Sequence, residues 1–280
     1  MKNVSLYMQR KDIISLSKKL ILLLAVIVIL MGCGSNLFEG MADKNSYEAK
    51  IEEARMALDD ADYEKAKSIL KGMDLKDPTV AQYLSNAYAG LAGLDTFNLL
   101  DTIDALTESD QTGSIDMVGK VLGDEDGKLT AGEIETKISY LNSAIDAMGN
   151  IQNLTDEQKV QLGLLSLNRA ALTIADIISG DQINQGKSGD ITLTEESLDN
   201  LYPTGTVDFS QEATPDRLNT LSTDITNVAN SIDAILRITG QTTGEENDLA
   251  NNFDEFSNAV DTDGNGDITT TELENYIKTL

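Results

Sequence analysis

Apolar residues recur at a helical spacing along most of this chain. Residues at i, i+3, i+4 and i+7 form one face of an α-helix, whereas strict alternation of apolar and polar residues marks a strand. Alternation over the length of a strand is almost absent. The sequence therefore predicts an all-α fold, a bundle of helices. The predicted helices cover 46–61, 63–70, 80–91, 94–106, 157–180 and 215–239.

The segment 157–180 differs from the others, because apolar residues cover nearly its whole circumference. A helix that is apolar all round is buried in a core. Arg169 is the exception, and we expect it to pair with an acid on a neighbouring helix. Residues 181–213 have weak periodicity with Gly, Ser and Pro203, which predicts a long surface loop. Together these features predict a helical core at 109–240.

The amino-terminal residues 1–32 have the pattern of an export signal. Basic residues dominate the start, and an unbroken apolar run follows at Leu20–Met31. A run this short does not span a bilayer and suits a cleaved signal peptide. The next residues, Gly32 and Cys33, complete the string Leu-Met-Gly-Cys, which resembles a bacterial lipoprotein box. Its methionine departs from the small residue usual at that position.

The resemblance implies cleavage before Cys33 and lipid on its thiol and new amine, so that acyl chains hold the protein at a membrane surface. Gly34 follows, and the lack of Asp there fits lipoproteins of the outer membrane in a bacterial cell envelope. Residues 33–45 read as a tether from the lipid. A plain secretory signal and an uncleaved anchor are the alternatives.

The composition removes several classes of function. The chain has 47 acidic and 21 basic residues, a formal charge of −26, which repels nucleic acid and attracts cations. It has no histidine and one cysteine, Cys33, which excludes Ser-His-Asp catalysis and the usual zinc sites. Phosphate-binding glycine loops and a G-x-S-x-G motif are absent. We expect no enzyme activity and no nucleic-acid partner; solubility alone is another reason for the charge.

The most informative stretch is Asp261–Glu272, which reads DTDGNGDITTTE. A twelve-residue calcium loop needs oxygen ligands at positions 1, 3, 5, 7, 9 and 12, and glycine at position 6, here Gly266. Position 7 offers its backbone carbonyl, and position 9 acts through its hydroxyl or a water. Ile268 at position 8 is expected to enter the core. The candidate ligands in order are Asp261, Asp263, Asn265, Asp267, Thr269 and Glu272, the last bidentate.

Apolar stripes flank this loop, with Phe253, Phe256 and Val260 before it and Leu273, Tyr276, Ile277 and Leu280 after it. The helix-loop-helix resembles an EF-hand over residues 252–280, inside a predicted carboxyl-terminal unit at 241–280. The resemblance implies Ca²⁺ as the cofactor. An acidic turn between two helices is the alternative, since Asp, Asn and Gly are ordinary turn residues.

Leu122–Glu133, LGDEDGKLTAGE, echoes this loop. Asp124, Asp126 and Glu133 stand at positions 3, 5 and 12, so the stretch is a weaker second candidate for calcium. Leu122 at position 1 has no ligand to offer. The alternative is a loop that keeps the fold without the ion.

A third stretch, Asn184–Glu195, repeats the string G-D-I-T. It has Gly186 and Ser188 at ligand positions, and we expect a loop without metal. EF-hand loops usually work in pairs joined through position 8. Two residues, Leu129 and Ile191, are therefore candidates to pair with the terminal loop, and we predict Leu129.

The helices at 46–108 resemble tetratricopeptide hairpins. When Tyr47 is position 1, small residues fall at positions 8 and 20 (Ala54 and Ala66), Leu70 at 24 and Pro78 at 32. Other positions depart from the pattern, and one and a half repeats do not form a free-standing solenoid. A generic helical hairpin is the alternative.

These features predict a calcium-binding envelope lipoprotein, in which calcium stabilises the fold or a surface that binds another envelope protein. The alternative is an adaptor that uses its tetratricopeptide-like face, with calcium in a structural role only.

Overall fold

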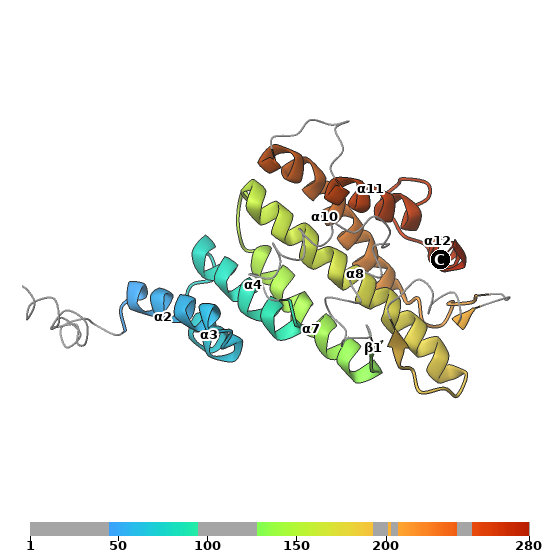
Figure 1. Cartoon of the computed structure of the whole chain (residues 1–280), viewed down its shortest axis with the longest axis horizontal. Helices are drawn as coiled ribbons and strands as arrows, with labels where there is room; N and C mark the ends of the chain where they lie inside the picture. The colour runs from blue at the N-terminus through green and yellow to red at the C-terminus, as the bar shows by residue number, and fades with distance from the viewer. Residues whose placement is uncertain (1–44, 95–127, 193–200, 203–206, 240–247, 280) are drawn as a thin grey trace, which may run out of the picture. The chain divides into compact units, whose positions relative to one another are not determined.

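The computed structural model describes residues 45–94, 128–192, 201–202, 207–239 and 248–279 (Figure 1). Most of these residues are helical, which confirms the all-α prediction. Among these residues there are two short strands, β1 (Lys128–Leu129) and β2 (Ile191–Thr192). The helices are α2 (Tyr47–Asp59), α3 (Tyr63–Leu70), α4 (Pro78–Ala92), α7 (Ala131–Met148), α8 (Asp156–Asn184), α10 (Pro215–Thr239), α11 (Asp248–Val260) and α12 (Thr270–Thr279).

The chain divides into two compact units, residues 1–49 and 50–280. In the second unit, packing follows the order of the chain. Each described helix from α3 onward packs against the next: α3 on α4, α4 on α7, α7 on α8, α8 on α10, α10 on α11 and α11 on α12. Their apolar faces share one hydrophobic core.

The helices α3 and α4 begin at capping residues that the sequence supplies. The Asp62 carboxylate accepts from Lys65 N at the start of α3, and Asp77 caps α4 with Pro78 at its first position. Proline suits this place because the first helical N–H has no partner within the helix. Ala54, Ala66 and Leu70 have no exposed surface. Any closely packed helical hairpin shares this burial, so the tetratricopeptide resemblance stays a prediction.

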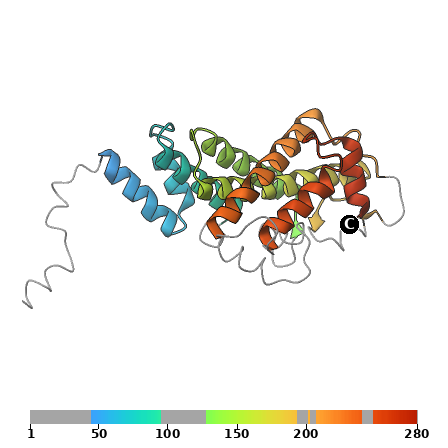
Figure 2. The ribbon, with the colours of Figure 1, turned by 90° about the horizontal axis from the view of Figure 1, so that it is seen from above.

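The helix α8 lies at the centre of the second unit, beside α10 along much of its length (Figures 1 and 2). It starts at a capping box between Thr155 and Gln158. Among the described helices, α8 alone is long and apolar enough to cross a membrane. However, 89% of that apolar window is buried inside the protein, which fits the predicted core helix.

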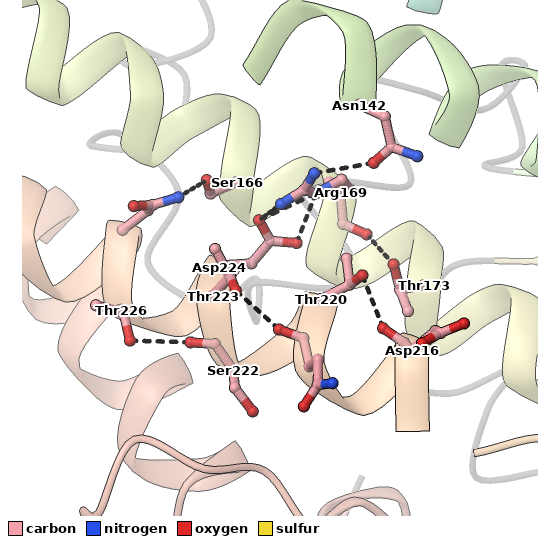
Figure 3. Close-up of polar contacts among 12 residues, drawn as sticks. Asn142, Ser166, Arg169, Thr173, Asp216, Thr220, Ser222, Thr223, Asp224 and Thr226 are labelled. Atoms are coloured by element: carbon pink, nitrogen blue, oxygen red, sulfur yellow. Dashed lines mark hydrogen bonds and ion pairs between the residues drawn. The ribbon is translucent and has the colours of Figure 1, made fainter. Parts of the chain in front are cut away.

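Arg169 pairs with an acid of a neighbouring helix, as predicted. Its guanidinium donates to both carboxylate oxygens of Asp224 on α10, with N···O distances of 2.7–3.1 Å. A further N–H donates to Asn142 Oδ1 on α7 at 2.9 Å (Figure 3). The group connects three helices inside the core.

The prediction of a surface loop at 181–213 was wrong in part. The helix α8 continues through 181–184, and β2 lies within the segment. Phe209 has no exposed surface and Val207 has 4%. The ring of Phe209 meets that of Tyr202 edge-on, with centroids 5.8 Å apart. These apolar residues are too sparse to give a periodic pattern, yet they fill the core.

Several predicted features lie outside the described residues. They are the signal peptide, Cys33, most of the tether, residues 95–106 of the helix expected at 94–106, and Asp124 and Asp126 of the second candidate loop.

Candidate metal centre

The candidate metal centre lies between α11 and α12, where the sequence analysis placed a helix-loop-helix. Asp261 directly follows the last residue of α11, and Glu272 lies in the first turn of α12. Val260 and Leu273, beside these two acids, have no exposed surface. The rings of Phe256 and Tyr276 meet edge-on across the two helices, 6.0 Å between centroids. Apolar packing on both sides therefore fixes where the loop starts and ends.

Three of the predicted ligands come together. Carboxylate oxygens of Asp261, Asp263 and Glu272 all lie within 4.8 Å of one another. Calcium binds oxygen at 2.3–2.6 Å, so two ligands on opposite sides of one ion are separated by about 5 Å. The three carboxylates thus lie close enough together to share a single ion.

The backbone of the loop turns around Asp261. Its Oδ1 accepts the N–H of Asn265 at 3.2 Å, and its Oδ2 accepts that of Gly266 at 2.8 Å. Gly264 and Gly266 have φ of +67° and +84°. These left-handed values suit glycine, because a Cβ would meet the following carbonyl. The glycine expected at position 6 therefore lets the loop close on Asp261.

Glu272 is held by hydrogen bonds from both ends of the loop. Its Oε2 accepts from Thr269 N at 3.0 Å and Thr269 Oγ1 at 2.8 Å. Its Oε1 accepts from Thr262 N and Oγ1, at 3.0 and 3.1 Å. Burial raises the pKa of Glu272, but the donors of Thr269 and Thr262 outweigh it and leave the pKa below its usual value.

Thr262 is a residue that the sequence analysis missed. It occupies position 2 of the loop, which supplies no ligand in the calcium pattern. The only indication of its role in the sequence was a hydroxyl group two residues after the end of α11. The N–H and the hydroxyl of Thr262 both donate to Glu272 Oε1 and so hold the carboxylate toward the loop.

The remaining predicted ligands lie on the outer part of the loop. Asn265 is exposed, and its Nδ2 donates to Asp263 Oδ2 at 2.7 Å. Its Oδ1 accepts from Asp267 N at 2.6 Å. The Asp267 carboxylate is exposed and does not join the cluster of three; the predicted ligand of this residue is its backbone carbonyl. Thr269 is occupied by its contacts with Glu272.

Among the described residues, no basic side chain pairs with the acids of this cluster. Asp261 and Glu272 are only 8% and 7% exposed. Within the part of the chain that the structure describes, no lysine or arginine forms a salt bridge with either of them or with Asp263. Buried carboxylates are costly unless a cation accompanies them. The arrangement thus suits a hard cation, which prefers oxygen ligands.

The predicted partner of the terminal loop was wrong. Leu129 pairs instead with Ile191, in the antiparallel register of β1 and β2. Both residues stand at position 8 of their stretches, so the two weaker loops pair with each other. Ile268, the third residue at position 8, donates its N–H to Ser222 Oγ on α10 at 2.8 Å. The sequence has no feature that assigns partners among three similar loops.

The second candidate loop is described only from Lys128 onward. There Glu133 repeats a feature of Glu272: it accepts from the N–H and hydroxyl of the threonine three residues before it, Thr130, at 2.8 and 2.7 Å. In the third stretch Asn184 donates to Glu212. Among the described residues, the cluster at Asp261 is the only group of three acidic side chains close enough to share an ion.

Comparison with models of protein families, with curated proteins and with solved structures finds no match to this chain.

Proposed function

We propose that this protein is a calcium-binding lipoprotein of a bacterial cell envelope that catalyses no reaction. The observation that carries the proposal is the cluster of Asp261, Asp263 and Glu272, with oxygens within 4.8 Å and no basic partner among the described residues. The lipid anchor rests on the sequence around Cys33. Export would place the loop where calcium is plentiful, and extracellular modules bind it at about 10⁻⁴–10⁻³ M.

The chemistry of the donors favours calcium over other ions. Every candidate ligand is an oxygen, and the chain has no histidine and only one cysteine, so soft metals lack their ligands. Magnesium demands a tight octahedral shell at about 2.0–2.1 Å, whereas calcium takes 6–8 oxygens in flexible geometry. A loop with four side-chain oxygen donors, a backbone carbonyl and a threonine suits the larger ion.

Calcium would stabilise the folded chain through linkage. It binds the assembled loop and not the unfolded chain, which adds about 2.7 kcal/mol at a free concentration 100 times the Kd. The ion also relieves the repulsion among three acids. Because Asp261 follows α11 and Glu272 begins α12, binding would fix the angle between these helices and any surface they present to another envelope protein.

The test is calorimetric titration of the full-length chain in detergent. Wild-type protein should release or absorb heat with calcium up to the millimolar range. Glu272→Gln removes one charge and the bidentate clamp at nearly constant size, and should weaken binding by at least tenfold. Glu255→Gln, the matched control, removes an exposed charge on α11 and should bind like wild type. Equal heats for wild type and Glu272→Gln, or no heat for wild type, would contradict the proposal.

A second candidate function is an adaptor in which calcium is only structural. It rests on the sequence pattern at 46–108, where Ala54, Ala66 and Leu70 stand at positions that a tetratricopeptide hairpin fills with small or apolar residues, and all three are buried. Affinity capture from envelope extract, with and without calcium, separates the two. Capture of the same partner at equal yield, together with a calcium-dependent melting temperature, favours the adaptor.

A further inference from the structure

The backbone at Ile268 is bonded to a side chain of another helix. Its own side chain is 4% exposed, and its N–H donates to Ser222 Oγ at 2.8 Å. The Ser222 hydroxyl in turn donates to Leu218 O at 2.9 Å, within α10. The proton of the hydroxyl therefore points along α10, and an oxygen lone pair remains for the amide. The bond joins residues 46 positions apart in the sequence.

The loop stays close to α10 beyond this contact. A Cβ placed on Gly266 would lie 4.0 Å from Thr226 Oγ1, one helical turn after Ser222. α10 itself is fixed from its other side, where Asp224 receives the guanidinium of Arg169 on α8 (Figure 3). The loop is thus attached to a helix that the core holds in place.

Position 8 of the two other loop stretches is already used. Leu129 and Ile191 pair with each other and not with Ile268. A buried N–H without a partner costs about 1–3 kcal/mol. The Ser222 hydroxyl avoids this cost by accepting the Ile268 N–H.

We propose that Ser222 is a positioning residue for the calcium loop: it takes the place of a second loop, holds residues 266–268 against α10 and raises calcium affinity. The inference rests on the proposed function. With the amide held, the loop keeps its ligands near their final places, and binding costs less ordering. Calcium must stabilise the contact with α10 by the same factor by which the contact favours calcium, because coupling is reciprocal.

Titration calorimetry and amide hydrogen exchange on the full-length chain in detergent test this inference, with calcium chloride as the probe. Ser222→Ala should weaken calcium binding about fivefold, the effect of losing one hydrogen bond. It should also speed exchange of the Ile268 amide in calcium-free protein. Ser222→Thr keeps a hydroxyl and should restore both. Thr223→Ala, the matched control, removes a hydroxyl that bonds Asn219 O on the exposed side of α10 and should change neither.

The outcomes separate the two proposals. If wild type binds calcium and Ser222→Ala binds it equally well, the positioning role is wrong and the proposed function stands. If Thr223→Ala weakens binding as much as Ser222→Ala, the effect belongs to α10 in general and the role of Ser222 is overturned. If wild type binds no calcium, both proposals fail, whatever the exchange of the Ile268 amide.

Discussion

Arg169 shows what a buried charge requires of its neighbours. Its side chain is 8% exposed and that of Asp224 is fully buried. Burial raises the pKa of Asp224 to about 6, while the hydrogen bonds and charge of Arg169 oppose the rise. Two charges in a core are tolerated when they are hydrogen-bonded as well as paired. Asn142 Oδ1 accepts a hydrogen bond from a guanidinium N–H that does not bind Asp224.

Removing one partner should therefore be costly. Arg169→Met leaves Asp224 as an unpaired buried carboxyl and should lower the free energy of unfolding by about 3–5 kcal/mol in urea titrations. The exposed pair Arg237–Asp156 is the control, and Arg237→Met should cost no more than about 1 kcal/mol. Arg169→Met combined with Asp224→Leu should recover most of the loss, since a packed apolar pair replaces the ion pair. Equal losses for Arg169→Met and Arg237→Met would refute this account.

Between helices, close approach depends on the absence of a side chain. Gly163 on α8 faces Ser231 on α10, and a Cβ built at Gly163 would collide with the Cβ and hydroxyl of that serine. Ser231 is completely buried. The colliding atoms lie at the base of the serine side chain, so a change of rotamer does not remove the clash. The distance between α8 and α10 at this point is set by the glycine.

Gly163→Ala should consequently destabilise the protein by about 1–3 kcal/mol through overpacking. Gly132→Ala on α7 is the control: an added Cβ there has nothing within 4 Å. Alanine also favours helix over glycine by up to about 1 kcal/mol, so this variant should melt at the wild-type temperature or slightly above it. Thermal unfolding followed by circular dichroism compares the two. A melting temperature unchanged by Gly163→Ala would show that the helices separate without cost.

Helices were predicted well where an apolar stripe and a cap agree. The bounds of α3 and α10 are those expected from the sequence, because their ends coincide with capping or turn residues. α8 was expected to stop at Gly180 and instead runs through Asn184. A Cβ at Gly180 would approach Glu212 Cγ at 3.2 Å, so this glycine serves close packing and not helix termination. That role is invisible in a single sequence.

The sequence predicts which acidic residues of the candidate site come together, but it does not predict what surrounds them. Asp261, Asp263 and Glu272 follow from spacing alone, since each loop position has its own chemical requirement. The pairing of Leu129 with Ile191 does not, because two-residue strands have no alternation and the partners lie far apart in the chain. Ser222 is likewise one of several hydroxyl residues on α10, and only the fold brings it to Ile268.

At the scale of the whole molecule, the proposed signal peptide and lipid anchor would decide where the protein meets calcium. Cys33→Ser should abolish incorporation of radiolabelled fatty acid and leave unprocessed precursor or a soluble form. The reason is chemical, since a serine hydroxyl does not replace the cysteine thiol in forming the thioether to lipid. Detergent partitioning of wild type and variant gives a second measurement. Label on Cys33→Ser, or wild type that never enters detergent, would remove the lipoprotein from the proposal.

The sequential packing of the helices also bears on how this chain folds. From α3 to α12, each described helix contacts the next one along the chain. Where the connection is short, as between α7 and α8 or between α11 and α12, little loop closure is needed before these helices meet, and such local contacts favour fast folding. The β1–β2 pair is the exception, because its strands are separated by α7 and α8. The β1–β2 pair would therefore form late in folding, after α7 and α8 have packed against each other.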